Sequence, residues 1–272
     1  MYQRLGQHFL INKAAIRAIV RAVDPQDGET IVEIGPGHGE LTREIKNQNA
    51  KIKIIAIEKD RRLAATLATY YAGDDDIEII PGDALTLLPS FIHNSLFIIH
   101  NSSYKLVGNI PYYLTGRLFR VIGELPHKPR RIVFTLQREV AERLCAQPPR
   151  MNLLAASVQI WAEPRIVRRL VPADFSPAPK VESAVVKLET WNLERGTQNR
   201  ERYYRLIKII FKQPRQTIMN NLSRGLGIKK SEIQKKLAVL GVDPACRPQE
   251  LSLATLNSLT TLKKFPLLIS PC

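Results

Sequence analysis

An amide, a proline and an aromatic residue follow one another where a short apolar run ends. The run 106–109 has the composition of a buried strand, and Asn109, Ile110, Pro111 and Tyr112 stand at its end. Pro111 lacks a backbone donor and keeps Ile110 out of the helical region, so the chain must turn there. An Asn-Gly or Asp-Gly pair would make a simpler turn. The four residues indicate either an ordinary loop with tyrosines on the core or a reacting centre that needs fixed hydrogen-bond acceptors.

Glycines and two carboxylates at the ends of earlier apolar runs suggest a nucleotide site. The run 30–34 leads into Gly35-Pro36-Gly37-His38-Gly39, and glycines at such a turn let the backbone approach a ligand beside a helix start. Glu58 ends the next run, 23 residues after Gly35, where an acid can accept the hydroxyls of a ribose. Asp83 follows the third run, where it can accept an amino proton of adenine. NAD and S-adenosylmethionine both contain these two groups, and both fit the pattern.

A parallel sheet would bring these groups to one edge. From residue 29 the sequence alternates short β-branched runs with helical stretches, which is typical of a doubly wound α/β sheet. The right-handed crossover rule puts the carboxyl ends of the strands at a common edge, where such proteins bind ligands. We predict strands at 30–34, 52–57, 77–80, 106–109 and 131–136, with helices at 40–47, 61–71, 114–124 and 138–146.

The rest of the chain changes character twice. After a helical stretch at 152–162, the runs 165–171 and 184–188 follow each other without a helix, which predicts an antiparallel edge pair. Beyond Trp191 the pattern is helical, and Gly225, Gly227 and Gly241 are interpreted as helix stops. We therefore expect a nucleotide-binding catalytic domain at 1–190 and a small all-α domain at 191–272. The segment 90–103 could be an extra strand or an insertion, and the sequence does not decide between them.

Composition and charge favour a folded protein with a polyanionic partner. The 272 residues are 44% hydrophobic, and no run reaches the ~18 apolar residues of a membrane helix. The cysteines Cys145, Cys246 and Cys272 are odd in number and widely spaced, which predicts free thiols in a reducing, cytoplasmic compartment and no metal site. The net charge is +15, and residues 191–272 hold 15 Lys and Arg against 5 Asp and Glu. This asymmetry favours nucleic acid, ahead of an anionic membrane surface.

The first 23 residues are basic like a transit peptide, but the apolar face of 12–23 favours a folded helix.

Motifs in order along nearly the whole chain resemble the ribosomal RNA adenine dimethyltransferases of the KsgA type. Asn-Ile-Pro-Tyr is similar to the signature of methyltransferases that modify exocyclic amines, which favours S-adenosylmethionine over NAD. The matching segments are "GQHFL" (6–10), "EIGPGHGELT" (33–42), "IEKD" (57–60), "GDAL" (82–85), "GNIPY" (108–112), "LQREVAERL" (136–144), "FSPAPKVESAVVKL" (175–188), "FKQPRQTIMNNL" (211–222) and "LGVDPACRPQELSL" (240–253). One departure is Pro214-Arg215-Gln216, where the family tends to have an Arg-Arg-Lys run, and this puts RNA contacts in that helix in doubt.

The resemblance implies a Rossmann-like, S-adenosylmethionine-dependent methyltransferase with a helical RNA-binding domain. It implies N6,N6-dimethylation of two adjacent adenines in a 3′-terminal hairpin loop of 16S rRNA, by a monomer acting on the immature 30S subunit. The same fold serves the erythromycin-resistance enzymes of 23S rRNA and non-catalytic assembly or transcription factors, which remain alternatives. The residues implied to bind the cofactor are His8, Leu10, Gly35, Gly37, Glu58, Asp83 and Asn109.

The opening four residues then have a chemical role. An adenine amine is a poor nucleophile because its lone pair is delocalised into the ring. The side-chain oxygen of Asn109 and the carbonyl of Ile110 can each accept one N–H, while Pro111 fixes the turn, so that catalysis rests on positioning and electrostatics without a general base. Tyr112 and Phe175 are expected to stack on the two faces of an unpaired or flipped-out adenine. Tyr113 has no assigned role.

Overall fold

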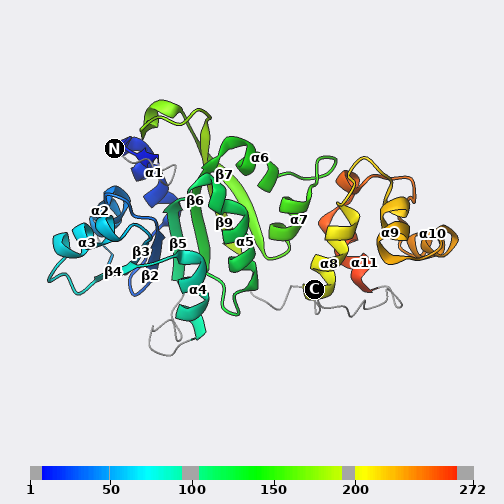
Figure 1. Cartoon of the computed structure of the whole chain (residues 1–272), viewed down its shortest axis with the longest axis horizontal. Helices are drawn as coiled ribbons and strands as arrows, with labels where there is room; N and C mark the ends of the chain where they lie inside the picture. Colours follow the sequence, from blue (N-terminus) through cyan, green and yellow to red (C-terminus); the bar gives the residue numbers. More distant parts are fainter. Residues whose placement is uncertain (1–7, 49, 94–103, 192–199, 262–272) are drawn as a thin grey trace. The chain divides into compact units, whose positions relative to one another are not determined.

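A mixed sheet of seven strands organises the first part of the chain (Figure 1). The computed structural model describes residues 8–48, 50–93, 104–191 and 200–261. The strands are β2 (Thr30–Ile34), β3 (Lys53–Glu58), β4 (Ile77–Pro81), β5 (Tyr104–Asn109), β6 (Arg131–Gln137), β7 (Ala162–Leu170) and β9 (Ser183–Thr190). They lie in the order β4-β3-β2-β5-β6-β9-β7. The pairs from β4 to β6 are parallel, whereas β9 is antiparallel to both β6 and β7. The predicted α/β sheet with an antiparallel edge pair is confirmed.

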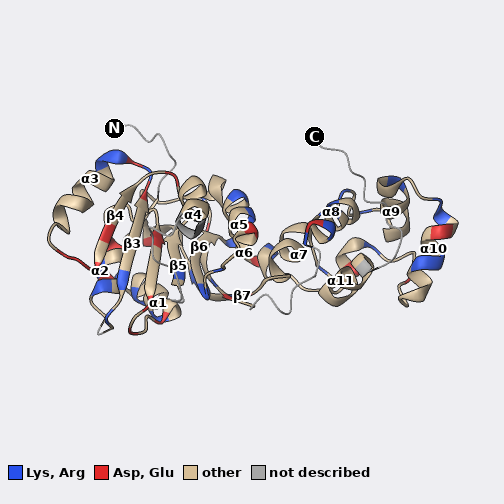
Figure 2. Ribbon diagram, turned by 90° about the horizontal axis from the view of Figure 1, so that it is seen from below, with Lys and Arg blue, Asp and Glu red and all other residues tan. Residues whose placement is uncertain are grey.

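Helices cover both faces of this sheet (Figures 1 and 2). They are α1 (Lys13–Val23), α2 (Glu40–Lys46), α3 (Arg61–Tyr70), α4 (Ala84–His93) and α5 (Thr115–Glu124), and α6 (Arg138–Leu144) follows β6 directly. Helix α1 buries Ile16 and Ile19 in one apolar cluster with Val133 of β6. The next strand residue, Phe134, faces the other side, where its ring lies 6.1 Å from that of Phe119 in α5. All five residues of β2 are buried because helices cover the strand from both sides.

Two features of the first unit differ from the sequence prediction. Helix α4 was not predicted; of the undecided segment 90–103, residues 94–103 lie outside the described residues. The strands β1 (Phe9–Leu10) and β8 (Phe175–Ser176) form a separate antiparallel ribbon, with Leu10 opposite Phe175. This ribbon joins the start of the chain to the loop between β7 and β9.

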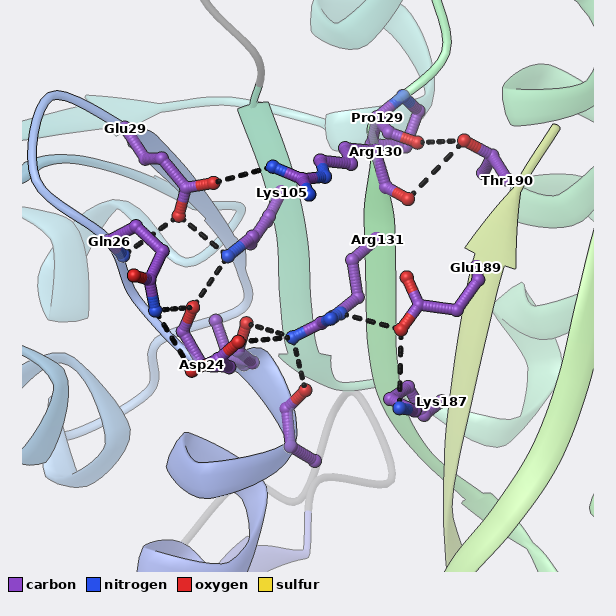
Figure 3. Close-up of polar contacts among 12 residues, drawn as sticks. Asp24, Gln26, Glu29, Lys105, Pro129, Arg130, Arg131, Lys187, Glu189 and Thr190 are labelled. Carbon is purple, nitrogen blue, oxygen red and sulfur yellow. Dashed lines mark hydrogen bonds and ion pairs between the residues drawn. The ribbon is translucent and has the colours of Figure 1, made fainter. Parts of the chain in front are cut away.

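A network of polar groups, with a buried ion pair at its centre, holds the end of α1 against the start of β5 and β6 (Figure 3). Lys105 and Glu29 form an ion pair of 2.6 Å, and their side chains are only 3% and 6% exposed. Lys105 Nζ also donates to the carbonyl of Asp24 (2.6 Å), the residue that ends α1. Arg131 donates to Asp24 Oδ2 (3.2 Å) and to Glu189 Oε1 of β9 (2.9 Å). Because the strands are parallel, this network lies at the edge of the sheet opposite the carboxyl ends.

The second compact unit is helical. It contains α7 (Leu153–Gln159), α8 (Arg200–Ile210), α9 (Ile218–Leu226), α10 (Lys230–Val239) and α11 (Leu253–Thr261). Gly225 lies inside α9, where a Cβ atom would come within 2.3 Å of Ile209 Cγ2 in α8. It therefore serves close helix packing and is not the helix stop that we expected. Gly227, with φ 67°, is the residue that ends α9 in the left-handed conformation.

The division between the two units differs in part from the expected domains. The first unit ends at Thr190, where we expected a boundary, but residues 143–161 belong to the second unit, together with the chain from Trp191 onwards. Helix α7 carries Ala155 and Ala156 into the core of the C-terminal helices. The Tyr203 hydroxyl donates to the Ala156 carbonyl (2.9 Å). The pattern of a single helix does not show which of two cores it joins.

Lys and Arg residues recur along the helices of the second unit (Figure 2). Lys229, Lys230 and Lys235 are exposed at and within α10, and Lys236 pairs with Glu232 of the same helix at 3.2 Å. Among the described residues, no helix combines the length and the apolar character needed to cross a bilayer.

Candidate active site

The glycine turn after β2 is tied to the end of β3 by one buried carboxylate. The Gly37 N–H donates to Glu58 Oε2 (3.0 Å), and the Asp60 N–H donates to Glu58 Oε1 (2.8 Å). Gly35 N–H donates to the Ile57 carbonyl (2.9 Å). Gly37 has φ 62°, and a Cβ atom there would lie 2.8 Å from the Phe9 ring. Both its conformation and its contact therefore require glycine at this point.

A second carboxylate, Glu33, lies beneath the turn in β2. It is 1% exposed and accepts a hydrogen bond from Thr42 Oγ1 at 2.6 Å. Burial raises the pKa of Glu33 to about 7, and the nearby Glu58 adds to the rise, whereas the Thr42 hydrogen bond opposes it. Glu33 therefore titrates near neutral pH.

Asp83, which follows β4, is engaged by a lysine. Lys59 Nζ lies 2.8 Å from Asp83 Oδ2, and the Leu85 N–H donates to Asp83 Oδ1 at 2.9 Å. The hydrogen bond from Lys59 lowers the pKa of Asp83. Asp83 is therefore an ionised acceptor, as contact with an adenine amine requires. Lys59 must share or release Oδ2 for that contact to form.

Asn109 ends β5 beside the glycine turn, and the N-terminal segment fixes its amide. Asn109 Nδ2 donates to the His8 carbonyl at 2.6 Å. No hydrogen bond within the described part of the chain uses Oδ1, so this oxygen is available to accept a substrate N–H. The Ile110 N–H donates to the Thr135 carbonyl of β6 (3.2 Å), which holds the turn against the neighbouring strand.

The aromatic rings next to Asn109 are held from two directions. The Tyr112 hydroxyl lies 2.9 Å from Ser183 Oγ, at the start of β9. The His8 ring is stacked beside the Tyr112 ring, with centroids 6.0 Å apart. His8 Nδ1 donates to the Pro177 carbonyl at 2.7 Å. Tyr113, the next residue, is 59% exposed.

These groups enclose a small cavity at the carboxyl edge of the sheet. Its volume is about 50 Å³, and it is lined by His8, Phe9, Gly35, Gly37, Glu58, Asn109, Ile110, Pro111 and Tyr112. All but Phe9 were predicted as site residues. The acceptors fit a nucleoside with a ribose at Glu58. The cavity is smaller than the ~300 Å³ usual for ligand pockets.

Three predicted site residues do not line this cavity. Asp83 lies at the neighbouring strand end with Lys59. Leu10 and Phe175 are 7% and 4% exposed and pack in the apolar cluster with α1. The ribbon of β1 and β8 sets Leu10 directly opposite Phe175, and both side chains enter the core. The structure thus does not bring the Phe175 ring to the cavity, and its stacking role stays a prediction.

The sequence did not indicate Phe9, Ser183 or Asp174 as part of the site. Phe9 and Ser183 lie within segments that matched the family, but neither side chain performs an evident chemical function. Asp174 is 8% exposed and accepts from Asn12 Nδ2 at 2.6 Å. Only the three-dimensional contact between the start of the chain and the β7–β9 loop gives these residues a role.

Comparisons with known proteins agree on one family. The model of the family "Ribosomal RNA adenine dimethylase" matches residues 2–261. A "Ribosomal RNA small subunit methyltransferase A" of Dehalococcoides mccartyi is 35% identical over 92% of this chain and 84% of its own. A relative of the same name from Moorella thermoacetica is 34% identical over 94% and 90%.

Two solved structures share the fold. A dimethyladenosine transferase from Plasmodium falciparum superimposes with a TM-score of 0.75 at 23% identity, covering 95% of this chain and 97% of that one. The 23S rRNA methyltransferase ErmE gives a TM-score of 0.72 at 24% identity, covering 93% and 98%. At these identities the likeness concerns the fold, which both structures share almost from end to end.

Proposed function

The chain belongs to the ribosomal RNA adenine dimethylase family, and from that premise we propose that it dimethylates two adjacent adenines of 16S rRNA. We place these adenines in the 3′-terminal hairpin loop, reached within the immature 30S subunit in the cytoplasm, with the enzyme as a monomer. The observation that carries the proposal is the Asn109 amide, which the His8 carbonyl orients with Oδ1 free at the cavity. The names of the curated relatives support the small subunit as the site of action.

The proposed cofactor is S-adenosylmethionine, which supplies an electrophilic methyl group when bound. Glu58 would accept the ribose hydroxyls, and Asp83 would accept an amino proton of the adenine. The glycine turn offers backbone close to the ligand, since no side chain stands at Gly35 or Gly37. His8 and Phe9 lie over this site from the N-terminal segment.

The chain's own groups account for activation of the target amine. Asn109 Oδ1 and the Ile110 carbonyl accept its two N–H groups, which draws the nitrogen out of conjugation with the base and aims its lone pair. Pro111 fixes the turn that makes the two acceptors converge, and Tyr112, held by Ser183, supports one face of the base. Positioned acceptors of this kind contribute through orientation and electrostatics.

RNA binding by the second unit is part of the proposal. The exposed lysines of α10 can contact phosphates, and such contacts make affinity fall steeply with salt. Arg215 of the Pro214-Arg215-Gln216 segment is exposed between α8 and α9. We therefore expect it to contribute one phosphate contact where the family tends to have a longer basic run.

The test is methyl transfer to defined particles. Purified protein is incubated with S-adenosylmethionine and with 30S subunits that lack the modification, and RNA fragments are analysed by mass spectrometry. We expect dimethyladenosine at two adjacent positions of 16S rRNA. Labelling confined to 23S rRNA in a parallel incubation with 50S subunits would support the resistance-type alternative and contradict the proposal, as would transfer to neither particle.

Asn109→Ala tests the assignment of the reacting centre. Removing a positioned hydrogen-bonding group typically costs about 100-fold or more in rate, and we expect a loss of that size. Asn47→Ala, at an exposed position that ends α2, makes the same chemical change away from the site and should leave the rate unchanged. A full rate for Asn109→Ala would refute the mechanism.

A further inference from the structure

Asp174 is a buried carboxylate that lies outside the cavity and yet holds the segment that covers it. The residue is 8% exposed and directly precedes β8. Asp174 Oδ1 accepts from Asn12 Nδ2 (2.6 Å), and Asp174 Oδ2 accepts from the Val171 N–H (2.8 Å). The Asp174 carbonyl accepts from the Ile11 N–H at 2.9 Å and from the Asn12 N–H at 3.3 Å. Side chain and backbone together fix residues 11 and 12.

The fixed residues lead directly to the reacting centre. Three residues before Ile11, the His8 carbonyl holds Asn109 Nδ2 at 2.6 Å. The His8 ring is held by the Pro177 carbonyl, which lies three residues after Asp174 in the opposite segment. The ribbon of β1 and β8 spans the distance between these two attachments. Segments 8–12 and 174–177 therefore form one unit, in which Asp174 and Asn12 supply a side-chain hydrogen bond that is partly buried.

We propose that Asp174 is a positioning residue, which acts through Asn12 to hold the cavity-lining segment 8–12 and so to orient the Asn109 amide. For methyl transfer the inference rests on the proposed function, and for binding it rests on the proposed cofactor alone. Asp174 makes no contact with the cavity, so its effect on binding and rate passes through the segment that it holds.

The hydrogen bonds at this pair have a fixed direction. Asn12 uses Oδ1 to cap α1, where it accepts from the Ala15 N–H at 3.1 Å, and so only its Nδ2 can face Asp174. Asp174 must then accept at both of its oxygens. Asp174→Asn would turn a donor toward Asn12 Nδ2 or toward the Val171 N–H. Asn12→Asp would set two carboxylates against each other.

Exchanging the two residues restores every bond. In Asn12→Asp combined with Asp174→Asn, the new carboxylate at 12 caps Ala15 with one oxygen and accepts from the new amide at 174 with the other. The amide oxygen at 174 then accepts from the Val171 N–H. The two single variants and the exchange variant thus have similar composition and differ in whether the pair can form.

The experiment measures binding and rate on folded full-length protein. Titration calorimetry gives the dissociation constant of S-adenosylmethionine, and single-turnover transfer to unmodified 30S subunits at saturating cofactor gives the rate. We expect each single variant to weaken cofactor binding and to slow transfer by about tenfold, because hydrogen bonds to charged groups are of that strength. The exchange variant should return both values to within about threefold of wild type.

The control and the opposing outcomes separate positioning from stability. Asp27→Asn changes a carboxylate that accepts from the Lys51 N–H (2.8 Å) near the opposite edge of the sheet, and it should alter neither value. If the single variants lower the melting temperature but keep wild-type binding and rate, Asp174 is only structural and the inference is wrong. Failure of the folded exchange variant to recover would also refute it. If the wild-type protein transfers no methyl group, but the single variants bind S-adenosylmethionine more weakly and the exchange variant recovers, only the proposed function is overturned.

Discussion

Glu33 makes the stability of the first unit depend on pH in a predictable direction. Its carboxyl group is 1% exposed in the middle of β2, and its pKa is raised from 4.5 to about 7. Each pH unit of such a difference corresponds to about 1.36 kcal/mol, so the rise is equivalent to about 3 kcal/mol. Because the group is fully buried, solvent does not screen this energy.

The sign follows from which form the fold prefers. Below about pH 4.5 Glu33 is protonated in the folded and the unfolded chain, and the stabilisation linked to its raised pKa is fully present. As the pH rises through 4.5 to about 7, the unfolded chain loses this proton before the folded chain does, and the stabilisation is lost. Above pH 7 the unit carries a buried charge at a cost of about 3 kcal/mol.

Glu33→Gln removes the charge and keeps the shape. The Gln oxygen can still accept from Thr42 Oγ1, which donates at 2.6 Å in the wild type. We expect the variant to match wild type at pH 4.5 and to be more stable by about 3 kcal/mol at pH 8. Glu124→Gln, on the exposed side of α5 where Glu124 pairs with Arg120, should follow the wild-type curve at both values.

The measurement must report on the first unit. The two tryptophans, Trp161 and Trp191, both belong to the second unit. Their fluorescence therefore reports unfolding of the second unit and not of the sheet that contains Glu33. Hydrogen exchange of peptides from β2 and β5, corrected for the effect of pH on the chemical exchange rate, gives the opening free energy of the sheet. The reasoning is refuted if Glu33→Gln raises the opening free energy of the sheet by the same amount at pH 4.5 and pH 8, or by more at pH 4.5.

Three further predictions concern residues placed by the structure. Lys105→Met removes the close cation of buried Glu29 and leaves it only Arg130, 3.9 Å away and largely exposed. The change should cost about 3 kcal/mol of sheet stability by the same exchange measurement, and adding Glu29→Leu should recover at least half of that loss. Gly37→Ala should lower the melting temperature through its φ of 62° and its contact with the Phe9 ring, and the loss should be smaller in a Phe9→Ala background. Tyr112→Phe loses only the contact with Ser183 and should slow single-turnover transfer a few-fold. Tyr112→Ala also loses the ring, which should cost about 1–3 kcal/mol more in stacking on the base. Equal rate losses in the two variants would argue against stacking.

The sheet and the main site residues were predictable because they depend on local patterns. Buried parallel strands have continuous apolar runs, and the crossover rule then fixes where Gly35, Glu58 and Asn109 must meet. The family resemblance added His8, whose type and position alone did not distinguish it from a surface residue.

The remaining features depend on long-range contacts. A ribbon of two-residue strands such as β1 and β8 has no periodicity to detect, so neither the place of Phe9 at the cavity nor the contact of Asp174 with Asn12 could be inferred. The same ribbon explains Phe175, because its register turns that ring into the core opposite Leu10. Helix α7 has an ordinary apolar face, and only the contact with Tyr203 shows which core it completes.

The interrupted path of the second unit has a consequence for synthesis of the chain. Helix α7 ends at Gln159, and its partner α8 begins at Arg200, about 40 residues later. At ~5–20 residues per second, translation takes about 2–8 s to cover that distance. The strands of the large sheet are complete at Thr190, before that partner is made. A nascent or truncated chain that stops at residue 190 would therefore present the apolar surface of Ala155 and Ala156 to solvent, where chaperones bind and aggregation starts.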